Sequence, residues 1–306
     1  MLKHNRRDFL KLLAASGLSL AMPSPVIASD ETLVLKPVPS SGEKLPVIGL
    51  GTSRVFEVGS GGFEREGPKE VLRTLANVPG SMMDTSPMYG SAETVVGDLA
   101  AELDVRDRLF FATKVWTRGR EEGIAQMRTS MQRLRTDRLD LIQVHNLVDT
   151  ATHLRTLRDW KEEGRVRYVG ITHYHAGAHE SLMRVMQKEP LDFVQVNYSL
   201  LEPEAQQRLL PLAQERGIAI IANRPFARGE LFRITKGKSL PGWAADLGIA
   251  SWAQYFLKFV VSHPAVTVAI PGTSKARHMR DNQMAGRGIL PDAATREQMF
   301  RYMRSI

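Results

Sequence analysis

Short apolar runs alternate with helical segments through most of this chain. Eight runs have the length and composition of buried strands, at residues 47–50, 81–83, 109–112, 139–144, 168–171, 193–196, 218–222 and 266–270. Eight further segments have apolar residues at helical spacing, at residues 68–78, 92–103, 124–134, 154–163, 180–188, 203–216, 250–262 and 275–285. Strands that alternate with helices pair in parallel through βαβ units. Eight such units favour a closed (β/α)8 barrel over an open sheet.

One barrel domain accounts for most of the length. A (β/α)8 barrel takes roughly 250 residues, and the chain has 306. Residues 33–46, with Ser-Ser-Gly at 40–42, predict a β-hairpin that caps the bottom of the barrel. We therefore predict a signal peptide at residues 1–28 and one barrel domain at residues 29–306.

The first residues have the pattern of an export signal. Residues 6–11 (RRDFLK) precede the apolar stretch 12–22, and residues 26–28 (VIA) end in the small residue that cleavage requires. The paired arginines resemble a twin-arginine signal, although an amphipathic terminal helix is the other interpretation. The apolar stretch is shorter than the roughly 20 residues of a membrane span. We expect cleavage after Ala28, export by the twin-arginine machinery to the periplasm or otherwise out of the cytoplasm, and no stable membrane span.

Charge and cysteine content exclude several classes of function. The whole chain has a net charge of +8, and residues 29–306 hold 37 Lys/Arg against 32 Asp/Glu, a net +5. A balance this small suits anionic small molecules and argues against a nucleic-acid partner. The chain has no cysteine, which excludes disulfides, thiolate metal sites and cysteine nucleophiles.

Four polar side chains lie at or just after the ends of predicted strands, where barrel enzymes place their active sites. Asp84, Lys114 and His145 end the second, third and fourth runs, and Tyr89 follows Asp84 on a loop. Reduction of a carbonyl group needs a hydride at carbon and a proton at oxygen. We expect Lys114 to lower the pKa of the Tyr89 phenol, and Asp84 to keep the lysine charged. His145 would hydrogen-bond to the carbonyl oxygen.

These residues belong to motifs that resemble the aldo-keto reductase superfamily. The motifs are 84–93 (DTSPMYGSAE), Thr113-Lys114 and 140–145 (DLIQVH), and the likeness runs in order from residue 48 to 282. The resemblance implies an NADP(H)-dependent carbonyl reductase or alcohol dehydrogenase with Tyr89 as general acid. Its small-molecule substrate would be an aldehyde or ketone, or a secondary alcohol in the reverse direction. The dinucleotide would lie extended across the barrel top, without a Gly-x-Gly-x-x-Gly turn.

The resemblance also implies which residues bind the cofactor. They are Thr52, Ser53, Asp84, Thr172, His173, Gln195, Arg224, Pro225, Phe226, Ala227, Gly229, Leu231, Ile270, Gly272, Thr273, Ser274, Lys275, Arg280 and Asn282. Lys275, Arg277 and Arg280 stand at the start of a predicted helix, whose free N–H groups favour anions. This favours the 2′-phosphate of NADP(H) over the hydroxyl of NAD(H), although a solvated basic helix face is the other interpretation.

Two positions depart from the family pattern. Thr172-His173 stands where Ser-Asn is usual, and His173 can still donate to a carboxamide. Residues 223–226 (NRPF) stand where Tyr-Ser-Pro-Leu usually stacks a ring on the nicotinamide. Arg224 or Phe226 can supply a stacking face instead, because guanidinium planes stack well. These changes bear on cofactor affinity and on the face that hydride transfer uses.

Two other interpretations compete with this one. His173, His175 and His179 have a spacing seen in metal sites. We predict no metal, because the end of the fifth strand already has a cofactor role. The second is a functional alternative, an exported nicotinamide-nucleotide-binding regulatory or sensor protein with little turnover. Its bound nucleotide would copurify and would not be consumed by any carbonyl compound.

Overall fold

Eight parallel strands form the centre of the protein. The computed structural model describes residues 32–306, so the expected signal peptide lies outside the described residues. The strands are β3 (Leu50–Gly51), β4 (Ser81–Asp84), β5 (Leu109–Val115), β6 (Leu139–His145), β7 (Val166–Thr172), β8 (Phe193–Asn197), β9 (Ala219–Asn223) and β10 (Val266–Ala269), hydrogen-bonded in chain order. The N–H of Gly49 donates to the Ala269 carbonyl at 2.9 Å, and the N–H of Ala269 to the Val47 carbonyl at 2.9 Å. The first and last strands therefore meet, and the predicted (β/α)8 barrel is confirmed.

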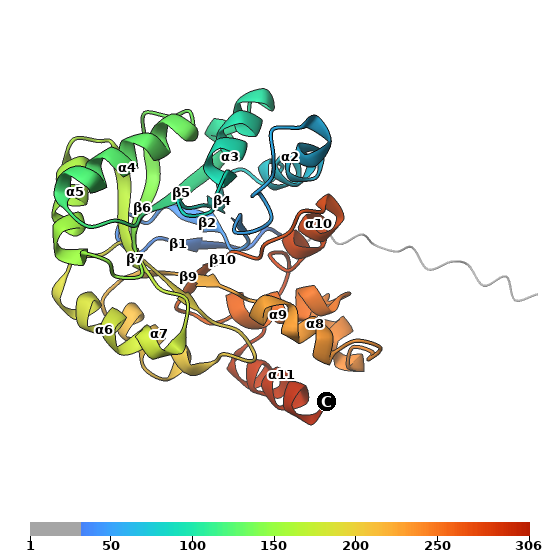
Figure 1. Ribbon diagram of the computed structural model, residues 1–306. Coiled ribbons are helices and arrows are strands. Elements are labelled where there is room, and N and C mark those ends of the chain that lie inside the picture. Colours follow the sequence, from blue (N-terminus) through green and yellow to red (C-terminus); the bar gives the residue numbers. More distant parts are fainter. Residues whose placement is uncertain (1–31) are drawn as a thin grey trace, which may run out of the picture. The chain divides into compact units, whose positions relative to one another are not determined.

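Helices surround the strands (Figure 1). They are α2 (Gly62–Ala76), α3 (Ala92–Glu102), α4 (Arg120–Arg133), α5 (Thr150–Glu162), α6 (His179–Lys188), α7 (Leu209–Glu215), α9 (Trp252–Val261) and α10 (Ala276–Met284). Each overlaps a predicted helical segment. Two more were not predicted, α8 (Glu230–Ile234) after β9 and α11 (Ala293–Ser305) near the C-terminus. In residues 32–306, none of the helices combines the length and hydropathy that crossing a bilayer requires.

Alternation along the strands separates two apolar layers. In β5, Phe110 and Ala112 face the barrel interior, whereas Phe111 packs in the layer between strands and helices. The same alternation holds in β6, where Leu141 faces inward and Ile142 outward. Successive side chains of a strand point to opposite faces, so each strand serves both layers. The strands are apolar on both faces because helices cover the outside.

The interior changes from apolar to polar toward the C-terminal ends of the strands. Lys114 follows Phe110 and Ala112 on the inner face of β5, and its strand neighbour is Gln143. Thr172 of β7 lies beside Gln195 of β8 in the same way. The polar inner positions at this end are Asp84, Lys114, Gln143, His145, Thr172, Gln195 and Asn223. The strand period therefore brings the predicted polar residues to one end of the barrel.

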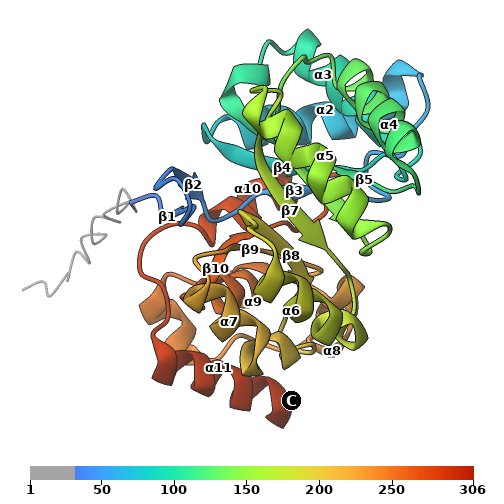
Figure 2. The same ribbon diagram turned by 90° about the vertical axis from the view of Figure 1, so that its left-hand side faces the viewer.

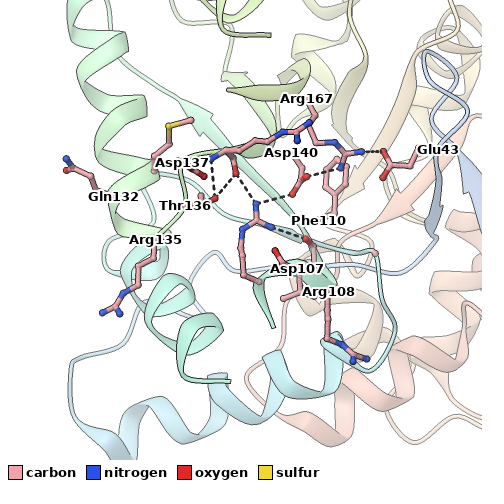
Figure 3. A pocket seen from close by; sticks show the side chains of 15 residues that line it. Glu43, Asp107, Arg108, Phe110, Gln132, Arg135, Thr136, Asp137, Asp140 and Arg167 are labelled. Atoms are coloured by element: carbon pink, nitrogen blue, oxygen red, sulfur yellow. Dashed lines mark hydrogen bonds and ion pairs between the residues drawn. The ribbon is translucent and has the colours of Figure 1, made fainter. Parts of the chain in front are cut away.

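A hairpin lies at the opposite end, as predicted. Strands β1 (Leu35–Pro37) and β2 (Lys44–Pro46) pair antiparallel and lie at the left edge of Figure 2. Val38 and Leu45 pack into the interior apolar cluster. Arg167, near the start of β7, donates to Glu43 of the hairpin at 2.5 Å and to Asp140 of β6 at 2.9 Å (Figure 3). The hairpin is thus fixed to the barrel by apolar packing and by a shared arginine.

Candidate active site

A cavity of about 590 Å³ lies at the C-terminal ends of the strands. Asp84, Tyr89 and His145 line it, together with residues of the loops after β3, β9 and β10. A larger cavity of about 890 Å³ lies at the hairpin end and is lined by charged side chains (Figure 3). Several of these charges pair with each other, Arg167 with Glu43 and Asp140 among them. The predicted catalytic residues all belong to the smaller cavity or its floor.

A buried ion pair forms the floor of the smaller cavity. The Nζ of Lys114 lies 2.7 Å from Oδ2 of Asp84 and donates to the Thr85 carbonyl at 2.7 Å. The other carboxylate oxygen, Oδ1, accepts from the amides of Gln143 at 3.1 Å and Gln195 at 2.9 Å. Burial by itself lowers the pKa of Lys114, but the Asp84 charge raises it above its ordinary value. Lys114 therefore remains an ammonium group at neutral pH.

Tyr89 lies beside this pair. The Lys114 Nζ is 5.1 Å from the centre of the Tyr89 ring, and the Tyr89 and His145 rings are perpendicular with centres 6.2 Å apart. Burial raises the pKa of Tyr89, and the Lys114 charge offsets only part of that rise. Lys114 therefore acts in the expected direction, but the pKa of Tyr89 is raised overall, because desolvation of the phenolate outweighs the attraction of the lysine. Tyr89 consequently keeps its proton at neutral pH, as a proton donor must.

His145 is a neutral imidazole in this setting. Its Nδ1 lies 3.3 Å from the Ser86 hydroxyl, and the side chain is buried. Burial, together with the charge of Lys114, lowers the pKa of His145 to about 3. A neutral imidazole offers one N–H donor and one acceptor. It can therefore donate a hydrogen bond to an oxygen in front of Tyr89 without carrying a charge.

The structure brings most of the predicted cofactor residues together. Those that line the cavity are Thr52, Ser53, Asp84, Thr172, Gln195, Arg224, Pro225, Phe226, Gly229, Ile270 and Gly272. Thr273, Ser274, Lys275, Arg280 and Asn282 follow Gly272 into α10. Leu231 is fully buried in the layer between strands and helices, and it is not among the cavity residues. His173 and Ala227 adjoin lining residues without lining the cavity themselves.

The two departures from the family pattern lie side by side. The Nδ2 of Asn223 donates to the His173 carbonyl at 3.1 Å and to Oε1 of Gln195 at 3.3 Å. Thr172 donates to the same Oε1 at 3.2 Å. The guanidinium of Arg224 lies 4.4 Å from the centre of the Tyr174 ring. The residues of these two loops therefore contact one another directly.

The histidines of the possible metal site make other contacts. The Nδ1 of His173 accepts from the Tyr174 N–H at 2.9 Å, and its ring packs against His175. The Nε2 of His179 lies 3.2 Å from Oδ1 of Asn197. Across the described part of the chain, no group of three or more His, Asp or Glu side chains is arranged to hold a metal ion.

Several residues of the cavity and its floor were not predicted from the sequence. Gln143 holds Asp84, while Asn223, Tyr174, Arg54 and Arg228 line the cavity. Gln143 precedes His145 by two positions, so strand alternation alone would have placed it on the same face. The loop residues carry no such signal, since their direction depends on the local backbone.

Comparisons with known proteins agree with this geometry. The model of the aldo/keto reductase family matches residues 47–294. Aldo-keto reductase YhdN of Bacillus subtilis (strain 168) is 27% identical over 209 residues, 63% of this chain and 62% of that protein, so the match spans less than two thirds of YhdN. Methylglyoxal reductase YeaE of Escherichia coli (strain K12) is 28% identical over 255 residues, 81% of this chain and 88% of that protein.

A solved structure is similar over nearly the whole barrel. It is an aldo-keto reductase from Klebsiella pneumoniae in complex with NADPH, with a TM-score of 0.75 and 25% identity. The superposition covers 89% of this chain and 96% of the other. The family match begins just before β3 and ends at the start of α11. This chain therefore belongs to the aldo/keto reductase family.

Proposed function

We propose that this protein is an NADP(H)-dependent carbonyl reductase that converts an aldehyde or ketone to the alcohol, with Tyr89 as general acid. The observation that carries the proposal is the buried Lys114–Asp84 pair beside Tyr89 at the floor of one cavity. The similar proteins include a methylglyoxal reductase and an NADPH-bound reductase, which supports the same reaction class and cofactor.

The cavity offers polar groups that suit a nicotinamide nucleotide. The Oδ1 atoms of Asn146 and Asn223 are buried without a hydrogen-bond partner among the described residues, and both residues line the cavity. A buried acceptor without a partner is costly, and an amide N–H of a ligand would satisfy it. Thr172, Gln195 and Asn223 would hold the nicotinamide end. NADPH, when bound there, supplies the hydride.

The segment after β10 suits the phosphate end of the nucleotide. Lys275, Arg277 and Arg280 are exposed, and none of them forms an ion pair within residues 32–306. They lie at or near the N-terminus of α10, which begins at Ala276. Free N–H groups and positive side chains together favour a phosphate. This supports NADP(H) over NAD(H).

The chain's own groups provide the proton and stabilise charge. Tyr89 holds a proton at its phenol oxygen, and the adjacent Lys114 ammonium stabilises the phenolate that remains after this proton has moved to the carbonyl oxygen. Asp84, held by two amides, keeps the ammonium in place. His145 orients the carbonyl by donating a hydrogen bond to its oxygen.

The Tyr89→Phe variant tests this assignment. Removal of the phenol hydroxyl should lower kcat by about 100-fold or more, because general acid catalysis contributes roughly 10²–10⁴-fold. The Kd of NADPH, measured by fluorescence titration, should change less than about 2-fold, because the hydroxyl acts in the chemical step and not in cofactor binding. Tyr302→Phe is the matched control, since the Tyr302 ring lies on α11. Full activity of Tyr89→Phe would refute its role, and a wild type that binds NADPH but reduces no carbonyl compound would favour the sensor alternative.

We further propose that the protein is exported through the twin-arginine pathway. The support is the sequence pattern of residues 6–28, which lies outside the described residues. In a Gram-negative host, the wild type should be found in the periplasmic fraction with Ser29 as its first residue. The Arg6→Lys, Arg7→Lys double variant should stay in the cytoplasm at full length, while Lys11→Arg serves as the control. Equal distribution of the wild type and double variant would contradict the proposal.

A further inference from the structure

Arg224 projects into the cavity that holds the proton donor. It follows β9 directly and lines the same cavity as Tyr89 and His145. Its guanidinium group lies over the Tyr174 ring, 4.4 Å from the ring centre. A guanidinium stacked on an aromatic ring is held in one orientation and keeps its N–H donors free at the edge of the plane.

In the described structure Arg224 has no carboxylate within ion-pair distance, although the charge of Glu202 is near enough to act against the lowering of its pKa. Within residues 32–306, Arg224 forms no ion pair, and the one carboxylate that lines the cavity, Asp84, is engaged by Lys114 and two amides. Burial and the neighbouring charge of Arg228 lower the pKa of Arg224. A half-buried cation that lacks a direct ion pair is stabilised by a bound anion.

Arg224 also lies within electrostatic reach of the reacting groups. Its charge lowers the pKa of Tyr89 in part, against the larger effect of burial, and contributes to lowering that of His173. Arg224 lines the same cavity as Tyr89 and His145, so a substrate whose carbonyl group is held by those two residues shares this cavity with the guanidinium.

The backbone at this loop is strained. Arg224 has a φ of 52°, and Ala227 and Arg228 have φ values of 47° and 57°. Residues with a side chain rarely adopt this left-handed conformation, because Cβ then comes too close to the following carbonyl oxygen. Such strain persists where the surrounding structure fixes it, and it is concentrated at functional sites. Here it directs an arginine into the cavity.

We propose that Arg224 binds the carboxylate of a 2-oxo acid whose oxo group is reduced at Tyr89. The inference rests on the proposed reductase function and names its substrate class. The fork of the guanidinium matches the two oxygens of a carboxylate. In the reaction the carbonyl carbon accepts a hydride from NADPH and the carbonyl oxygen accepts the Tyr89 proton. The C–H bond of the dihydronicotinamide, the Tyr89 O–H bond and the carbonyl π bond break, and a C–H and an O–H bond form on the substrate. The products are a 2-hydroxy acid and NADP⁺, and a proton from solvent restores the Tyr89 phenol.

The cofactor's own diphosphate presents the same anionic chemistry, so the experiment must separate the two sources. Glyoxylate and methylglyoxal form a suitable pair, because both carry an aldehyde next to a second carbon group. In glyoxylate that group is a carboxylate, and in methylglyoxal it is a neutral acetyl group. The comparison therefore changes the charge beside the reacting carbonyl and keeps the aldehyde.

The test measures kcat/KM for both substrates and the Kd of NADPH in the wild type, Arg224→Gln and Arg224→Lys. Arg224→Gln should lower kcat/KM for glyoxylate about 10- to 100-fold more than for methylglyoxal, the size of one charge-assisted contact. Arg224→Lys should recover part of this loss, because it restores the charge without the fork. The matched control is Arg233→Gln, an exposed arginine of α8 that pairs with Glu230.

Three results would overturn the inference. The first is an unchanged ratio of the two kcat/KM values in folded Arg224→Gln. The second is an equal loss for both substrates with a matching rise in the Kd of NADPH, which would assign Arg224 to the cofactor's diphosphate. The third is a wild type that reduces neither substrate nor any of a wider carbonyl panel, which would refute the proposed reductase function as well.

Discussion

At Tyr89, desolvation and a neighbouring cation act in opposite directions on a single proton. Burial favours the neutral phenol, and the Lys114 ammonium favours the phenolate. Because burial is the larger effect, the phenol is protonated before the reaction, and the ammonium then stabilises the anion that forms. The pair with Asp84 fixes the ammonium so that this stabilisation needs no rearrangement.

His145 gives the protein a specific dependence of stability on pH. Its pKa in the folded protein is about 3, against about 6.5 in an unfolded chain. Between these values the unfolded state binds one more proton, so stability falls as the pH falls from 6.5 toward 3. In His145→Gln, the slope of the unfolding free energy against pH near pH 5 should decrease by up to about 1.4 kcal/mol per pH unit.

Urea unfolding of both proteins at several values between pH 4.5 and 6.5 measures this slope. His175→Gln is the matched control for the loss of one histidine, because His175 is exposed. Parallel curves for the wild type and His145→Gln would show that His145 takes up a proton in the folded state as readily as in the unfolded state.

At the scale of elements, the periodicity of apolar residues in strands and helices predicted most of the fold. All eight strands and eight of the helices overlap predicted segments, because a barrel strand is covered on both faces and its apolar run is continuous. The sequence signal was weaker for α11, whose start is capped by Asp292 accepting from the Thr295 N–H at 2.8 Å. Only Met299 and Met303 of this helix are buried, while Phe300 and Tyr302 pack against the core at partly exposed positions.

The candidate site was predictable where strands place the side chains, and less so where loops do. Asp84, Lys114 and His145 converge because parallel strands end together. The orientation of Arg224 depends instead on a left-handed backbone and on a ring from another loop, Tyr174, and neither has a local sequence pattern. The direction of the Tyr89 pKa was also beyond the sequence, since it depends on how deeply the phenol is buried.

In the whole molecule, the residues of the proposed reaction and the charged network of the hairpin lie at opposite ends of the barrel. The proton donor and its partners lie where the strands end, and the hairpin with its charged network lies where they begin. In (β/α)8 barrels the C-terminal ends of the strands carry activity, and residues at the other end serve stability. The two properties should therefore respond to different substitutions.

Replacement of Arg167 by Met tests this separation. The change leaves Asp140 and Glu43 without their shared arginine, and should cost about 1–3 kcal/mol of unfolding free energy, the penalty for a poorly satisfied charge. At temperatures where the variant is folded, kcat/KM should equal that of the wild type, since Arg167 lies at the hairpin end. Arg120→Met, which removes an exposed pair with Glu121, is the control and should have little effect on stability.

Urea unfolding and steady-state kinetics on the same samples give both quantities. A loss of turnover in folded Arg167→Met would show that the two ends are coupled through the strands.

The alternation of inward and outward side chains also restricts how this chain can diverge. Inserting or deleting one residue within β5 would exchange the inner and outer faces beyond that point, and would move Lys114 out of the interior. A change in length after a strand, as in the segment that carries Arg224, leaves every inner position where it was. New substrate preferences in descendants of this protein should therefore arise from indels between the strands, while strand lengths and the proton donor's neighbours stay constant.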